Sequence, residues 1–291
     1  TSAEEIGQVY VSKINLLLFF GVLSLIFSFK SSEHLASAYG VTVTGAMLID
    51  TLLGAVLMLT IRRWNPLIFV PLFLIFFSLD SMFLATNLTK FFAGGWVPVT
   101  VAMGLLGLML TWIYGRERLL KSRWDRAIPL RDFVQQILDK PPLRVGGTAI
   151  YLAPYDHIAP STLTHNLRNN KVLHELVILM NIEVVNEPYV EDSHRVTYEE
   201  LPERLISARV HFGFMEDVNV MRAVAFLRAK GVHLTSTDLY FFVGKEKVVV
   251  KHSSSLLIGP FIFMHRSMQT AAEYFRIPLN HTIEIGGYIE V

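Results

Sequence analysis

Residues 34–61 contain the side chains with the clearest capacity for chemistry in this chain of 291 residues. The stretch is apolar enough to cross a membrane, yet Asp50 lies near its middle. A charge there is costly unless it is neutralised, paired or hydrated. Two interpretations of Asp50 are open: a structural carboxylate, bonded to a neighbouring helix or hydrated, and a member of an ion or proton path. For Asp80 the structural role is favoured, because it lies nearer a membrane interface.

Small and hydroxyl-bearing residues recur at spacings of four in the same stretch. They form two adjacent ridges of a helix, one of Ala36, Gly40 and Thr44 and one of Ala38, Thr42, Ala46, Asp50 and Gly54. Helices in lipid associate through close backbone approach and polar contacts. We therefore expect this face to pack against other helices rather than lipid.

Four segments are long and apolar enough to cross a membrane: 11–29, 34–61, 66–84 and 96–114. Residues 1–114 hold five of the 25 acidic and five of the 26 basic residues, so most of the charge follows them. We predict a transmembrane domain at 1–114, a basic and amphipathic connector at 115–142, and an α/β domain at 143–291.

The distribution of basic residues predicts the orientation of these helices. Arg62 and Arg63 lie between the second and third segments, and a basic cluster lies at 116–126. The other two loops contain only Lys30 and Lys90. Basic residues that flank spans mark the cytoplasmic side. We therefore expect the N-terminal end of the chain and the α/β domain to be cytoplasmic.

The residues after 142 alternate between patterns typical of strands and of helices. Strands are predicted at 148–153, 175–185, 194–201, 205–214, 239–250 and 281–291. Helices are predicted at 130–140, 161–170, 218–231 and 261–275, the third with Asp217 as its N-cap and Gly231 at its end.

No pattern in the chain points to catalysis. The motifs GxxxxGK[ST], GxSxG and HExxH do not occur, there is no cysteine, and the histidines lack the close pairing typical of zinc sites. We therefore expect no enzyme activity, no bound cofactor and no nucleic-acid partner.

Several long strings of the sequence resemble one family. "GQVYVSKINLLLFF" (7–20), "LASAYGVTVTGAML" (35–48) and "LDSMFLATNLTKFFAGGWVPV" (79–99) resemble the late membrane helices of the KUP/HAK/KT potassium transporters. "PPLRVGGTAIYL" (141–152), "HNLRNNKVLHE" (165–175) and "RIPLNHTIEIGGYIEV" (276–291) resemble parts of the family's cytoplasmic domain. The resemblance covers nearly the whole chain.

The resemblance implies potassium uptake across the inner membrane by proton-coupled symport, with K⁺ and H⁺ as the transported ions. It implies the last helices of an inverted-repeat, amino-acid-transporter-like scaffold, followed by a regulatory cytoplasmic domain. The chain then corresponds to the C-terminal portion, and the main K⁺ site is expected on helices absent from it. The expected partners are the lipid bilayer, the preceding helices, a homodimer partner and, as in some members, a cyclic dinucleotide.

Tyr39, Thr42 and Thr44 lie in the matched string at 35–48. Their oxygens suit a hard cation, or they hold helices together. The family usually has Ser or Thr at the position of Asp50, so the resemblance gives Asp50 no role. An alternative function is a membrane-anchored sensory protein in which the helices only tether a cytoplasmic ligand-binding domain.

Overall fold

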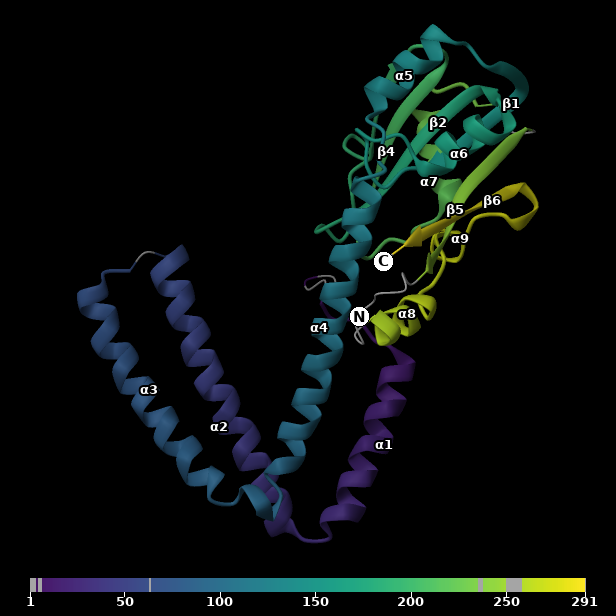
Figure 1. Ribbon diagram of the computed structural model, residues 1–291. Helices are drawn as coiled ribbons and strands as arrows, with labels where there is room; N and C mark the ends of the chain where they lie inside the picture. Colours follow the sequence, from purple (N-terminus) through teal and green to yellow (C-terminus); the bar gives the residue numbers. More distant parts are fainter. Residues whose placement is uncertain (1–3, 5–6, 63, 235–237, 250–257, 291) are drawn as a thin grey trace. The chain divides into compact units, whose positions relative to one another are not determined.

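The computed structural model contains four long apolar helices followed by an α/β domain (Figure 1). It describes residues 4, 7–62, 64–234, 238–249 and 258–290. Arg63, Val250 and Val291, which the expected features include, lie outside the described residues. By its internal contacts the chain divides into two compact units, Tyr10–Leu110 and Thr111–Val291 together with Thr1–Val9.

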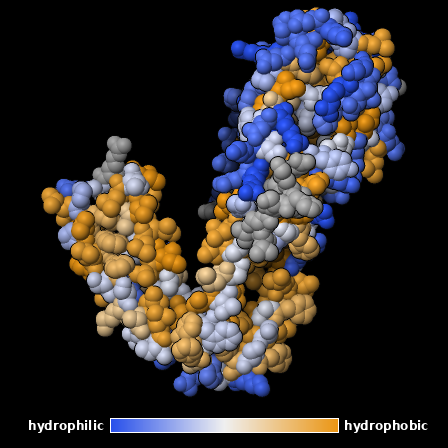
Figure 2. All heavy atoms as spheres, in the orientation of Figure 1, coloured by the Kyte–Doolittle hydropathy of each residue, from blue (hydrophilic) through white to orange (hydrophobic). Residues whose placement is uncertain are grey.

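The helices of the first unit carry many exposed hydrophobic side chains, as the face in Figure 2 shows. Their bounds are α1 (Ser12–Phe29), α2 (Ser32–Val56), α3 (Pro66–Leu88) and the first part of α4 (Trp96–Trp124), with a π-helical turn η1 (Leu57–Ile61) and a 3-10 turn η2 (Phe91–Ala93). Side chains cap the N-termini of two of these helices. Ser31 accepts a hydrogen bond from the amide of His34 in α2, and Asn65 accepts one from the amide of Leu67 in α3.

All four expected spans are present as helices, and the last is longer than predicted. It continues beyond Tyr114 to Trp124, through the first part of the expected connector. The reason is local, since residues 116–124 are mostly Arg, Leu, Lys and Glu, which favour helix, and contain no proline. The amphipathic helix expected in the connector is α5 (Leu130–Asp139).

The α/β domain contains one six-stranded sheet among the described residues. Its strands are β1 (Leu143–Leu152), β2 (Val172–Val185), β3 (Val196–Leu201), β4 (Leu205–Gly213), β5 (Leu239–Val249) and β6 (Thr282–Glu290). The spatial order is β3-β4-β2-β1-β5-β6, and only the β3–β4 pair is antiparallel. The apolar runs of β1 and β2 occupy the centre, as expected for strands buried on both faces.

Helices cover both faces of the sheet. On one face, Phe133 and Ile137 of α5 and Leu163 of α6 (Ser161–Asn170) pack against the strands. On the other face, the strands pack against α7 (Val220–Ala229) and α9 (Ala271–Tyr274). The four apolar helices and this layered domain confirm the expected fold class, while the inverted-repeat scaffold stays a prediction.

Two local predictions in the domain were wrong. Asp217 does not cap α7: Asn219 does so by accepting from the amide of Met221 at 2.8 Å, and Asp217 forms an ion pair with Arg276 at 2.6 Å. The helix expected at 261–275 is two helices, α8 (Ile258–Arg266) and α9. Thr270 forms a capping box with Glu273, and this cap begins α9 as a separate helix.

Candidate functional site

A buried carboxylate joins α2 to α3 in the membrane part. Asp80 is 6% exposed, and its Oδ2 accepts a hydrogen bond of 2.5 Å from Oγ1 of Thr51. The two helices approach closely on the same side, where a Cβ on Gly40 would collide with the side-chain amide of Asn87. Asp80 therefore has the neighbouring-helix partner that the structural interpretation requires.

The other residues singled out in the sequence do not gather around Asp80. Tyr39 and Asp50 are exposed among the described residues. Thr44 is buried, and both Thr42 and Thr44 donate back to the carbonyls four residues earlier, each at 2.8 Å. Such back-bonding satisfies a hydroxyl within its own helix. Thr44 lies on the α3-facing side, whereas the ridge through Thr42, Ala46 and Asp50 is exposed.

Thr51 was missed in the sequence. It lies seven residues after Thr44, two helical turns along the same face, and that spacing was the available signal. Its importance depends on Asp80, which is 29 residues away in the chain.

We expect Thr51→Val to destabilise the α2–α3 pair by about 1 kcal/mol, because it removes a hydrogen bond between membrane helices to the buried Asp80. Asp80→Ala should destabilise it further, whereas Asp80→Asn keeps an acceptor for Thr51 and should cost less. The measurement is the melting temperature of the purified protein in detergent. Asp50→Asn is the control, since Asp50 is exposed. Equal losses at Asp50 and Asp80 would contradict this assignment.

The α/β domain contains a cavity of about 1050 Å³ at the carboxyl-terminal parts of its parallel strands. Leu152 and Ala153 at the end of β1, and Val243 and Gly244 of β5, contribute to its wall. The chain leaves β1 toward β2 on one side and later returns to β5 on the other, so the strand order reverses between β1 and β5. Open α/β sheets bind ligands at such a switch point.

The first turn of α6 forms one wall of this cavity. Pro160 is its N-cap and provides no side-chain hydrogen bond to the first amides. Thr162 is 5% exposed and lines the cavity, and its Oγ1 is buried without a hydrogen-bond partner. Helix N-termini favour anions, and a buried unpaired hydroxyl is costly. Both features suit an anionic ligand.

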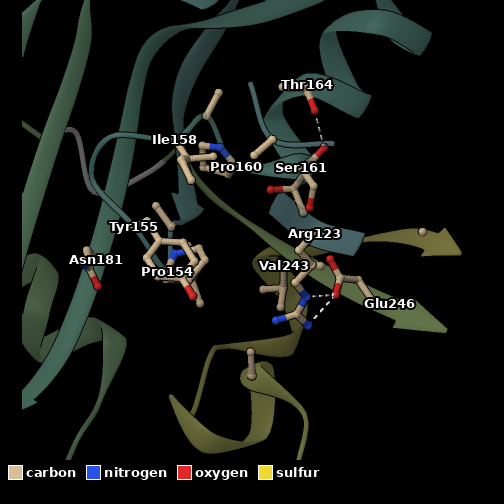
Figure 3. A pocket seen from close by; sticks show the side chains of 18 of the residues that line it. Arg123, Pro154, Tyr155, Ile158, Pro160, Ser161, Thr164, Asn181, Val243 and Glu246 are labelled. Carbon is tan, nitrogen blue, oxygen red and sulfur yellow. Dashed lines mark hydrogen bonds and ion pairs between the residues drawn. The ribbon is translucent and has the colours of Figure 1, made fainter. Parts of the chain in front are cut away.

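Two arginines from the end of α4 and the adjoining turn reach the same cavity. Arg123 binds Glu246 of β5 through Nε and Nη2, at 2.9 and 2.6 Å (Figure 3). Arg126 donates to the carbonyl of Tyr288 at 3.1 Å. Arg123 is partly exposed, with 43% of its side chain accessible. It therefore can bind an incoming anion while it remains close to Glu246.

Aromatic rings line another part of the cavity. The Trp124 ring lies 5.2 Å from that of Tyr155 and 6.0 Å from that of His157, measured between centroids, and the Trp124 and His157 planes are 23° apart. Such rings stack on planar groups. Burial, followed by the charge of Arg168, lowers the pKa of His165 in the cavity wall, which keeps that ring neutral near pH 7.

No sequence motif predicted this cavity. Its polar side chains come from many elements, among them α4, α6, β2, β4 and β5, and they are separated by long stretches of chain. Only the order of the strands brings them together.

Comparison with known proteins identifies the family. Residues 1–117 match the K⁺ potassium transporter integral membrane domain, and residues 146–291 match the K⁺ potassium transporter C-terminal domain. The chain is 38% identical over 295 residues to "Probable potassium transport system protein Kup" of Burkholderia mallei (strain SAVP1). It is 39% identical over 297 residues to the protein of that name in Burkholderia thailandensis (strain ATCC 700388 / DSM 13276 / CCUG 48851 / CIP 106301 / E264).

Each alignment covers 100% of this chain and 47% of the relative, so the chain spans about half the length of the curated relatives it matches. These relatives are named as transporters, which is consistent with the expectation that the chain is not an enzyme. Four membrane-capable helices, the α/β domain and the two matched domains confirm the resemblance seen in the sequence. The chain therefore belongs to the KUP/HAK/KT family of potassium transporters and is an integral membrane protein.

Proposed function

We propose that this chain forms part of a transporter that takes up potassium across the cytoplasmic membrane by proton-coupled symport. Family membership and the names of the relatives support potassium transport. In this proposal the α/β domain is cytoplasmic, in keeping with Arg62 and the basic residues at 116–126. Preceding helices and a second copy are the proposed protein partners.

The proposed roles of the membrane residues differ. Asp80 and Thr51 hold α2 to α3, and Thr42 and Thr44 serve helix packing, because their hydroxyls are bonded within the helix. Tyr39 and Asp50 are exposed, so contact with the ion path or with further helices remains open to them.

We propose that the α/β domain regulates transport. The observation that carries this is the continuity of α4, which is a single helix from Trp96 to Trp124 and ends in the wall of the cavity. A ligand that binds the cavity more tightly in one transport state shifts the equilibrium by its differential affinity. Since Arg123 belongs to α4 and to the cavity wall, ligand binding acts directly on the last membrane helix.

The proposed ligand combines anionic and planar groups. The N-terminus of α6, Thr162 and Arg123 suit phosphate, and the rings of Trp124 and Tyr155 suit a base. A cyclic dinucleotide carries both groups, and the cavity is large enough for a ligand of that class. The alternative is a membrane-tethered sensory protein that binds a ligand in the same cavity but does not transport ions. All residues that line the cavity lie within Thr111–Val291, so ligand binding there does not require the other membrane helices.

The test uses the full-length transporter in proteoliposomes and in cells that lack other potassium uptake. We expect uptake of potassium that falls when the proton gradient is collapsed. Arg123→Gln should insert normally and transport, but bind a cyclic dinucleotide about tenfold more weakly, because a charged hydrogen-bond donor is lost. Arg131→Gln is the matched control, because Arg131 is exposed on α5 and does not line the cavity.

The outcomes separate the parts of this proposal. Absence of uptake by the full-length protein would favour the tethered sensory protein. Potassium uptake that does not depend on the proton gradient would contradict proton-coupled symport. Uptake with equal ligand responses in the Arg123→Gln and Arg131→Gln proteins would overturn the role of the cavity.

A further inference from the structure

Helix α8 packs against the part of α4 that leads into the α/β domain (Figure 1). Phe261 of α8 is 1% exposed, and its ring occupies the space beside Gly115, where a Cβ would overlap it. The ring centroid lies 5.5 Å from that of Trp112. Leu119 of α4 and Ile258 and Ile262 of α8 extend the same cluster. The position of α8 along α4 is therefore determined by tight packing.

That position coincides with the end of the apolar part of α4. At about 1.5 Å per residue, residues 96–114 span roughly 28 Å, which is close to the thickness of the hydrocarbon core. Trp112 and Tyr114 are the amphipathic rings typical of a membrane interface, and Arg116 is the next charged residue. Phe261 thus packs at Trp112 and Gly115, at the end of the apolar part of α4.

The exposed side of α8 carries a large apolar side chain, Phe263. Phe263 follows Phe261 by two residues and so projects from the opposite side of the helix. Phe263 is 74% exposed, and Met268, just after the helix, is 55% exposed. A phenylalanine is poorly placed in water but well placed at the boundary between headgroups and acyl chains.

The charges around α8 favour an anionic surface. Arg266 on α8 and Arg116, Arg118 and Lys121 on α4 are exposed, and Glu117 is the one acidic residue in the segment 116–121. Arg118 lies over the ring of Tyr114, 4.8 Å from its centroid, which keeps this cation near the interface. Basic residues next to a span attract anionic lipids.

We propose that α8 is an interfacial helix that binds the membrane surface on the side of the α/β domain. Phe263 and Met268 insert at the boundary of the acyl chains, and Arg266 with the basic residues of α4 contacts anionic headgroups. The bilayer thus holds the α/β domain through α8 as well as through α4.

The absence of cysteine from the chain makes a direct test possible. A single cysteine at Phe263 (Phe263→Cys) is labelled with the environment-sensitive dye NBD in the full-length transporter, any cysteine elsewhere having been replaced. The protein is placed in nanodiscs of phosphatidylcholine with and without phosphatidylglycerol. The matched control is Tyr198→Cys on β3, also exposed and outside this region of the domain.

We expect NBD at position 263 to emit at shorter wavelength and to lose most of its fluorescence when the lipids carry brominated acyl chains. Both effects should increase with phosphatidylglycerol and weaken in the Arg266→Glu background, whereas NBD at position 198 should show neither. A blue shift without quenching by brominated lipid would mean that protein covers α8, and this would overturn the proposal. Emission typical of water at position 263 would overturn it as well.

Discussion

Arg195→Ala is expected to lower the free energy of unfolding of the α/β domain by about 3–5 kcal/mol. Arg195 is buried, and its Nη1 and Nη2 bind the two carboxylate oxygens of Glu216, each at 2.9 Å. The guanidinium also lies over the ring of Phe226, 4.6 Å from its centroid. Removal of the arginine leaves Glu216 as a buried charge without its hydrogen-bonded cation, which is the costly case.

The measurement is thermal unfolding of the purified protein, followed by near-UV circular dichroism. A loss of this size corresponds to a fall in melting temperature on the order of 10 °C. Lys245→Ala is the control, because Lys245 and Glu284 form a solvent-exposed ion pair at 2.7 Å and should contribute little. Similar melting temperatures for the Arg195→Ala and Lys245→Ala proteins would refute the importance of the buried pair.

The same pair predicts a pH dependence. Burial acts to raise the pKa of Glu216, but hydrogen bonds from Arg195 and from the amide of Gly213 outweigh it and lower the pKa below 4.5. The stabilisation is therefore present at neutral pH and is lost as the pH falls below 4.5 through the folded-state pKa. We expect the difference in stability between wild type and Arg195→Ala to shrink in that acidic range.

Gly115→Ala is expected to destabilise the contact between α4 and α8 by about 1–3 kcal/mol, through overpacking. The added Cβ would overlap the buried ring of Phe261. Alanine favours helix over glycine by about 1 kcal/mol, so a loss of stability here opposes the intrinsic preference. In the proposed function, the displaced contact should also weaken the response of transport to a ligand in the cavity.

Gly259→Ala provides the matched control for this substitution. Gly259 lies in α8, and a Cβ there would meet no atom within 4 Å, so the change should be neutral or stabilising. A second change, Phe261→Leu, should recover part of the stability of Gly115→Ala, because it frees space beside residue 115. If Gly115→Ala were as stable as Gly259→Ala, the close packing of α8 on α4 would be wrong.

Local patterns in the amino-acid sequence predict the fold class of this protein, a set of membrane helices followed by an α/β domain. Apolar stretches of membrane length predict α1 to α4, and the apolar or alternating runs after residue 142 predict all six strands of the sheet. These features depend on neighbouring residues, so they can be recognised without knowledge of the fold. The long strings shared with the KUP/HAK/KT family were informative for the same reason.

Which residues contact one another across long distances in the chain depends on the tertiary structure. The sequence places two carboxylates within membrane-length segments, but Asp80 meets Thr51 while Asp50 is exposed, because the rotation of α2 against α3 decides which face is buried. Likewise, Arg123 meets Glu246 only because the reversal of strand order places β5 beside β1 and near the end of α4. Helical and strand periodicity report one element at a time. The side chains that meet across elements are selected by the packing of the whole unit.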